Sequence, residues 1–93
     1  MTEKELQRAL SDALRVFGWR AYHPWTSVHS AAGYPDLCAV RGQRLLYAEL
    51  KGDRGRLTPQ QNAWLEALRG VVRPPDVYLW TPADLDHALE VLR

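Results

Sequence analysis

The chain has 93 residues and a mass of 10.6 kDa. That size leaves room for one compact domain and excludes two, since domains of roughly 100–150 residues are the commonest. Hydrophobic residues make up 46% and charged residues 25% of the sequence, as in soluble globular proteins and unlike disordered tails or fibrous repeats. The formal net charge of +1 argues against a protein that binds nucleic acid through bulk charge alone.

The sequence also indicates a compartment and what stabilises the fold. No apolar run is long enough to span a membrane, and no basic segment followed by an apolar one opens the chain. We therefore expect neither a transmembrane helix nor a signal peptide, and we place the protein in the cytoplasm. Cys38 is the only cysteine, which rules out an internal disulfide and leaves core packing to stabilise the fold.

The first third of the chain predicts a helix, a short strand and a long loop. Residues 2–17 place apolar side chains at three- and four-residue spacing, which is typical of an amphipathic helix, and Gly18 ends it. Residues 19–23 alternate aromatic and polar side chains as a strand does, and Pro24 ends the strand. From Trp25 to Pro35 no period is sustained, so we expect a loop there.

A hairpin is predicted next, followed by a helix, a strand and a helix. Strands at Asp36–Val40 and Arg44–Lys51 flank Gly42-Gln43, a glycine-first dipeptide typical of two-residue hairpin turns. The next helix has a threonine N-cap, a proline at its first position and a glutamine at its third. Residues 77–80 predict a buried strand, and Thr81-Pro82 opens a last helix.

This order of elements indicates an α/β fold, with a mixed sheet flanked by helices. The sequence shows no internal repeat and no linker. We therefore expect a single domain over residues 1–93.

The hairpin brings three charged residues together. If the turn is centred between Gly42 and Gln43, Asp36 and Glu49 are equidistant from the centre and lie opposite each other, with Cβ atoms about 5 Å apart. Lys51 projects from the same face as Glu49 because a strand alternates its faces. Two carboxylates at that distance can share a divalent cation, and a neighbouring ammonium can orient water or stabilise developing charge. The set therefore suits metal-dependent hydrolysis of phosphodiesters.

A purely structural interpretation of these residues is open. Asp36 could end a turn, and Glu49 with Lys51 could be a solvated ion pair worth a few tenths of a kcal/mol. The preceding residues 45–48 are apolar on both faces, which implies that both faces are covered. Unpaired charge would be costly at such a place, and this favours the functional interpretation.

Three sequence blocks resemble the motifs of the VRR-NUC branch of the PD-(D/E)XK nuclease superfamily. They are Gly33-Tyr34-Pro35-Asp36-Leu37, Tyr47-Ala48-Glu49-Leu50-Lys51-Gly52, and Leu57-Thr58-Pro59-Gln60-Gln61 with Trp64-Leu65. The resemblance spans residues 3–70. It implies a restriction-endonuclease-like αβββαβ core, which matches the order of elements above and is followed here by a C-terminal helix.

The resemblance further implies a nuclease that depends on Mg²⁺ or Mn²⁺. Asp36 and Glu49 would bind the metal, and the backbone carbonyl of Leu50 would complete its ligand set. Lys51 would serve catalysis, and Gln61 would support the site from the second helix.

Two candidate site residues could instead have an ordinary role in capping a helix. Gln61 stands at the third helical position after Thr58 and could close a capping box worth about 1 kcal/mol, but we favour a role in the site. The superfamily often adds a glutamate from the first helix, for which Glu3 and Glu5 are candidates. Glu3 leaves that helix toward the sheet, whereas Glu5 can close a capping box with Thr2, so we assign Glu3 to the catalytic set.

Four arginines are candidate DNA contacts. Arg54 and Arg56 lie in the loop that leaves the catalytic strand, and Arg41 and Arg44 flank the hairpin turn, where they oppose each other. A solvated basic surface is an equally good interpretation. We interpret the other chemically distinctive side chains as packing or surface residues: His23, His29, His87, Trp25, Tyr34 and Cys38.

We therefore expect a structure-selective DNA endonuclease, similar to enzymes that resolve four-way (Holliday) junctions and leaving 5′-phosphates, as the resemblance implies. No helix has the basic face needed to read a base sequence. A junction presents two symmetric strands, so we expect a homodimer. One alternative is a flap or single-strand nuclease that acts as a monomer or within a larger assembly. Another is a non-catalytic nucleic-acid-binding module, which the intact Asp36, Glu49 and Lys51 disfavour.

Overall fold

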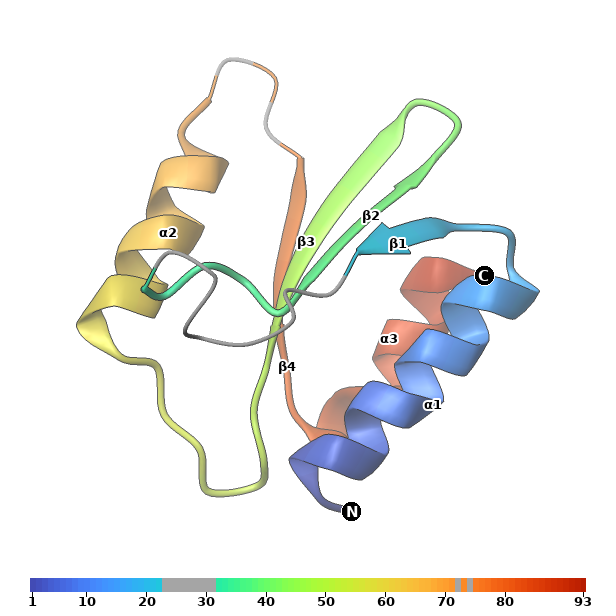
Figure 1. The fold of residues 1–93 in the computed structure, drawn as a ribbon, viewed down its shortest axis with the longest axis horizontal. Helices are drawn as coiled ribbons and strands as arrows, with labels where there is room; N and C mark the ends of the chain where they lie inside the picture. Colours follow the sequence, from blue (N-terminus) through green and yellow to red (C-terminus); the bar gives the residue numbers. More distant parts are fainter. Residues whose placement is uncertain (23–31, 72, 74) are drawn as a thin grey trace.

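A mixed four-stranded sheet between two layers of helices forms the fold in a computed structural model, which describes residues 1–22, 32–71, 73 and 75–93 (Figure 1). The strands are β1 (Arg20–Tyr22), β2 (Leu37–Arg41), β3 (Arg44–Leu50) and β4 (Asp76–Trp80), in that spatial order. The first three strands are antiparallel neighbours, and β4 runs parallel to β3. The predicted α/β class and the mixed sheet are confirmed.

The helices lie on both faces of the sheet. They are α1 (Glu3–Val16), α2 (Pro59–Arg69) and α3 (Leu85–Leu92), the last preceded by a 3₁₀ turn, η1 (Pro82–Asp84). Figure 1 shows α1 and α3 side by side on one face and α2 on the other. The main core lies under α1 and α3, and its largest members are Leu6, Leu10, Leu14, Trp19, Leu37, Leu46, Leu50, Trp80 and Leu92. Alternate residues of β3 therefore point into this core, and the residues between them point toward the α2 side.

The boundaries of the elements follow the local signals in the sequence. α1 begins after Thr2, whose hydroxyl accepts from the Glu5 amide while the Glu5 carboxylate accepts from the Thr2 amide. Gly18 ends α1 with φ +82°, and Gly42 takes φ +60° in the hairpin turn, a backbone conformation that side chains with a Cβ rarely adopt. The predicted capping box and hairpin turn are both confirmed.

Two expectations about strands need correction. β1 is shorter than predicted, since Trp19 precedes it, is buried in the core and donates from Nε1 to the Leu92 carbonyl at 2.9 Å. β4 is not buried on both faces, because it is an edge strand and Leu79, on its α2 side, is 40% exposed.

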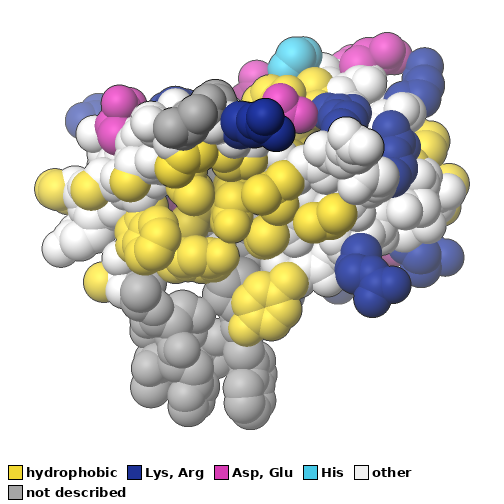
Figure 2. All heavy atoms as spheres, turned by 90° about the horizontal axis from the view of Figure 1, so that it is seen from above, with side chains coloured by type: hydrophobic (Ala, Val, Ile, Leu, Met, Phe, Trp, Pro, Cys, Tyr) yellow, Lys and Arg dark blue, Asp and Glu magenta, His cyan; other side chains and the backbone are white. Residues whose placement is uncertain are grey.

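Some apolar side chains on the α2 side of the sheet are also exposed. They include Tyr22 on β1, Val40 on β2 and Leu45 on β3. Figure 2 shows apolar side chains gathered over one area of the surface. None of the helices in the described part of the chain has the length and apolarity needed to cross a membrane.

Candidate active site

The register of the hairpin places Asp36 opposite Glu49. Leu37 pairs with Ala48 and Cys38 with Tyr47, so the residue before β2 continues the ladder toward Glu49. The pairing therefore agrees with the register predicted from the turn. Glu49 lies on the α2 side of the sheet, opposite to the core-facing residues on either side of it.

A backbone hydrogen bond fixes Asp36 at the end of β3. Its Oδ2 accepts from the Leu50 amide at 2.9 Å. Pro35, directly before it, is buried among the most enclosed side chains of the molecule. Asp36 is thus held by both its neighbour in the chain and the facing strand.

The loop before Asp36 packs tightly against α2. Gly33 has φ +82°, and a Cβ at this position would overlap the backbone of Gln60, so only glycine fits. The Tyr34 and Trp64 rings meet edge to face with their centres 5.0 Å apart, and Trp64 Nε1 donates to the Ala32 carbonyl at 3.1 Å. This packing role for Tyr34 is the one predicted, and it ties the Asp36 segment to α2.

Glu49 is a buried carboxyl group with a strongly perturbed pKa. Its side chain is only 2% exposed. Among the described residues, Glu49 is the only charged residue buried to this extent. Burial, followed by the neighbouring Asp36 carboxylate, raises the pKa of Glu49 to about 8, and Lys51 partly opposes this rise. Without a bound cation, Glu49 therefore carries a proton through most of the neutral range.

Lys51 provides the positive charge next to this carboxyl group. Its Nζ lies 3.6 Å from Glu49 Oε2, and its side chain is 15% exposed. Its backbone amide donates to the Trp80 carbonyl at 3.0 Å, which extends the β3–β4 pairing beyond the end of β3. Lys51 thus faces the carboxylate pair from a fixed backbone.

A glycine that the sequence analysis did not single out limits the position of Lys51. A Cβ added at Gly55 would lie 2.9 Å from Lys51 Cβ and 3.1 Å from its Cδ. The Gly55 amide donates to the Gly52 carbonyl at 3.0 Å, which closes a turn just after the catalytic strand. The corresponding signal in the sequence is a pair of glycines three residues apart, Gly52 and Gly55.

Gln61 closes the capping box of α2 in this structure. Its Oε1 accepts from the Thr58 amide at 2.9 Å, and its own amide donates to Thr58 Oγ1 at 3.1 Å. The capping role of Gln61 is therefore present, and its role in the active site stays a prediction.

Glu3 is the first residue of α1 and is exposed. Its Cβ lies 3.9 Å from where a Cβ of Gly52 would stand, so the start of α1 approaches the segment after Lys51. The described residues nonetheless contain no group of three or more acidic, histidine or cysteine side chains that could hold a metal ion, so the structure does not add Glu3 to the carboxylate pair. Its catalytic role stays a prediction.

Arg41 and Arg44 have other partners than the expected DNA phosphates. Arg41 donates to the carbonyls of Phe17, Leu92 and Arg93 at 3.0–3.2 Å, at the ends of α1 and α3. Arg44 donates to the Val91 carbonyl at 3.2 Å and to Asp76 at 3.0 Å. The two guanidinium groups also lie 4.7 Å and 5.1 Å from the Trp19 ring centre. These contacts offset the repulsion that the register creates between the two guanidinium groups, and the DNA contacts expected of Arg41 and Arg44 stay a prediction.

Arg54 and Arg56 are exposed in the connection between β3 and α2. They remain predicted DNA contacts. His87 is exposed on α3, as expected for a surface residue. Cys38 is a free, half-buried thiol beside Tyr47, less enclosed than the core position predicted for it. His23, Trp25 and His29 lie outside the described residues.

Comparisons with known proteins agree with the fold. No curated protein matches the chain. Two solved structures of VRR_NUC domains resemble it, one with a TM-score of 0.73, 17% identity and 97% of each chain covered. The other has a TM-score of 0.70 and 23% identity, covering 99% of this chain and 85% of that one.

The Archaeoglobus fulgidus protein Hjc, a Holliday junction resolvase from an archaeal hyperthermophile, is similar at 26% identity and a TM-score of 0.58. This match covers 84% of our chain and 67% of Hjc. A model of the VRR-NUC domain family matches residues 1–71, which include every element of the Asp36–Glu49 site. The chain therefore belongs to the VRR-NUC domain family, and its role is that of a nuclease related to junction resolvases.

Proposed function

We propose that this chain, as one domain over residues 1–93, is a metal-dependent endonuclease that hydrolyses DNA phosphodiesters at the Asp36–Glu49 pair. The observation that carries the proposal is the burial of Glu49 against Asp36, with Lys51 as the neighbouring cation. Two apposed carboxyl groups at a buried position destabilise the metal-free protein, and such a cost is typical of functional sites.

The residues present fit a hard divalent cation. Both side chains supply carboxylate oxygen, the donor that Mg²⁺ and Mn²⁺ prefer, and a cation would offset the burial and the repulsion from Asp36 that together raise the pKa of Glu49. Asp36 and Glu49 would hold the ion, and the Leu50 carbonyl would add a third oxygen. When bound, the cation neutralises the scissile phosphate and makes water a stronger nucleophile.

The other side chains have separate roles in this reaction. Lys51 places an ammonium beside Glu49, where it orients the attacking water or stabilises the charge that develops on the phosphate. The attack displaces the 3′-oxygen and leaves a 5′-phosphate. Glu3 and Gln61 support the site from α1 and α2, Gln61 by leaving its capping bond when substrate is present.

We assign the contacts to the DNA backbone near the scissile phosphate to Arg54 and Arg56. Both are exposed and follow Lys51 within five residues, whereas Arg41 and Arg44 are engaged with backbone carbonyls. Contacts of this kind hold phosphates without reading bases. They suit an enzyme that selects the shape of a branched DNA, such as a four-way junction.

We further propose that the enzyme acts as a homodimer. The exposed apolar side chains on the α2 side of the sheet, among them Tyr22, Val40 and Leu45, support this, since apolar patches of this kind mark protein interfaces. A dimer would supply two sites for the two symmetric strands of a junction. Val40→Glu should then convert a species of twice the chain mass into a monomer.

The experiment is cleavage of a panel of labelled DNA substrates by the purified protein in Mg²⁺ or Mn²⁺. Four-way junctions, flaps, duplexes and single strands are compared, with Asp36→Ala as the inactive control. We expect paired nicks in the junction, with 5′-phosphate ends. Preferred cutting of flaps or single strands would contradict the resolvase assignment, and DNA binding without cutting in either metal would contradict the nuclease.

A further inference from the structure

The outward face of α1 carries a row of basic and polar side chains. Lys4, Arg8, Ser11 and Arg15 recur at intervals of three or four residues, so they lie on one side of the helix. We call these four residues the α1 stripe. The three cationic side chains are exposed and Ser11 is half-buried, while the opposite face of α1 packs into the core.

The acidic residues of α1 lie beside the stripe and not within it. At 100° per residue, Glu3, Glu5 and Asp12 leave the helix outside the arc that the stripe covers. The capping bonds with Thr2 lower the pKa of Glu5, so this carboxylate stays ionised. Asp12 lies 3.7 Å from Arg15, and both side chains are largely exposed. Three cationic side chains and no acidic one thus form one side of α1, a basic helix face that the sequence analysis did not expect.

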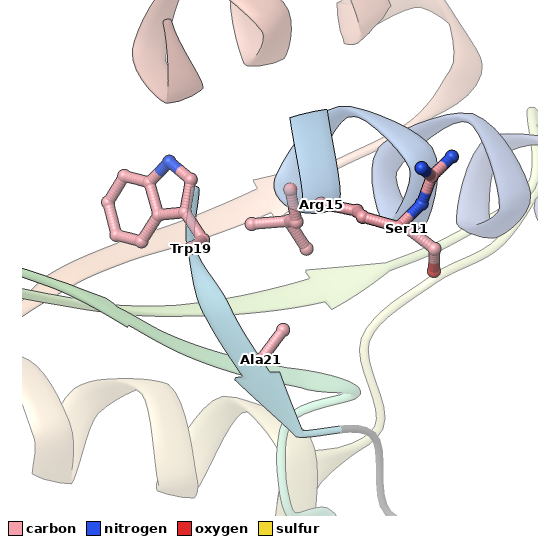
Figure 3. A pocket seen from close by; sticks show the side chains of 5 residues that line it. Ser11, Arg15, Trp19 and Ala21 are labelled. Atoms are coloured by element: carbon pink, nitrogen blue, oxygen red, sulfur yellow. The ribbon is translucent and has the colours of Figure 1, made fainter. Parts of the chain in front are cut away.

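Two hollows follow one another along the stripe. One has a volume of about 300 Å³ and is lined by Lys4, Gln7, Arg8 and Ser11. The other has a volume of about 320 Å³ and is lined by Ser11, Leu14, Arg15, Trp19 and Ala21. In Figure 3, Ser11 and Arg15 extend from α1, and Ala21 lies across from them on β1. Ser11 lines both hollows, so they lie next to each other along the helix.

The stripe begins beside the candidate active site. Lys4 follows Glu3, whose Cβ approaches Gly52, the residue after Lys51. At a rise of about 1.5 Å per residue, Lys4 and Arg15 are about 16 Å apart along the helix axis. This length corresponds to roughly five nucleotides of a DNA strand, which rises about 3.4 Å per nucleotide.

We propose that the α1 stripe binds the phosphate backbone of the DNA arm adjoining the scissile phosphate, an inference that rests on the proposed nuclease function. The ammonium, guanidinium and hydroxyl groups of the stripe are donors suited to successive phosphates. Such contacts carry no sequence information. They fix the direction in which one arm leaves the active site, which selects branched shapes.

The test measures DNA binding by fluorescence anisotropy in an Asp36→Ala background, which does not cut. Lys4→Gln, Arg8→Gln and Arg15→Gln are combined, because glutamine keeps helix propensity without charge. Each lost phosphate contact lowers the slope of log affinity against log salt by about 0.9, so we expect the slope to fall by about 2.7 and the affinity by more than tenfold at low salt. The control combines Arg69→Gln on α2 with Arg93→Gln directly after α3. Both cations are exposed, and their loss should change neither quantity.

A second measurement separates binding from a structural effect. Bis(p-nitrophenyl) phosphate is too short to reach the stripe, so the triple variant with Asp36 intact should hydrolyse it at the wild-type rate. Loss of this activity would overturn the proposed DNA-binding role of the stripe. Unchanged DNA affinity together with an unchanged salt slope would overturn it as well. If binding depends on the stripe but the wild-type protein cuts no DNA, the proposed nuclease fails and the stripe stands. If the wild-type protein neither binds nor cuts DNA, both proposals fail.

Discussion

Glu49→Gln should remove the pH dependence of stability that Glu49 gives the metal-free protein. The folded state raises the pKa of Glu49 from 4.5 to about 8, so it binds this proton more tightly than the unfolded chain does. Stability from this proton is complete below about pH 4.5 and is lost as the pH rises toward 8. The size of the shift sets an upper bound of about 5 kcal/mol, since each pH unit is worth about 1.36 kcal/mol.

The glutamine variant removes this dependence, because its amide can still donate to Asp36 but does not ionise. We expect urea unfolding in chelator to show wild-type stability falling between about pH 5 and about pH 8.5, while that of Glu49→Gln stays nearly flat. Glu66→Gln, an exposed carboxylate on α2, is the control and should follow the wild type. A wild-type protein whose stability stays constant or rises over this range would refute the assignment of the buried proton to Glu49.

Three further predictions concern other residues of the fold and the candidate site. Gly55→Ala should displace Lys51 and slow cutting on the order of tenfold or more with unchanged DNA affinity, as measured by single-turnover kinetics. Arg41→Gln should lower the free energy of unfolding by roughly 2 kcal/mol through its lost carbonyl bonds, as measured by urea unfolding. Glu3→Gln should slow cutting by about tenfold, whereas Glu5→Ala should lower the free energy of unfolding through the lost capping box.

Each of these predictions has an outcome that would contradict it. Wild-type rates in Gly55→Ala would mean that Lys51 tolerates displacement. Weaker DNA binding in Arg41→Gln, with unchanged stability, would support the phosphate contact that the sequence predicts for Arg41. Loss of cutting in folded Glu5→Ala but not in Glu3→Gln would reverse the assignment of the two glutamates.

The central hairpin could be predicted because its determinants are local. Gly42 fixes the turn, the turn fixes the register, and the register places Asp36 opposite Glu49. The capping boxes at Thr2 and Thr58 are likewise local, because each depends on only four consecutive residues. Alternation along β3 then assigned Glu49 to one face without any tertiary information.

Features that depend on distant contacts could not be predicted in this way. The arginines of the hairpin stack on Trp19 and bind carbonyls at the C-terminal end of α3, which lies about fifty residues away in the chain. The exposure of Leu79 follows from the place of β4 at the edge of the sheet, which a strand pattern does not specify. The close approach of Gly55 to Lys51 is also a property of the folded turn alone.

The proposed function requires that Asp36 and Glu49 hold a divalent cation during cutting. The most direct test is cleavage of a labelled four-way junction by metal-stripped protein in excess chelator, followed by stepwise addition of Mn²⁺ or Mg²⁺. We expect no cutting in chelator, recovery in the wild type as the cation is restored, and no recovery in Glu49→Gln at the same concentrations. Wild-type rates in chelator, or equal recovery in the variant, would contradict it.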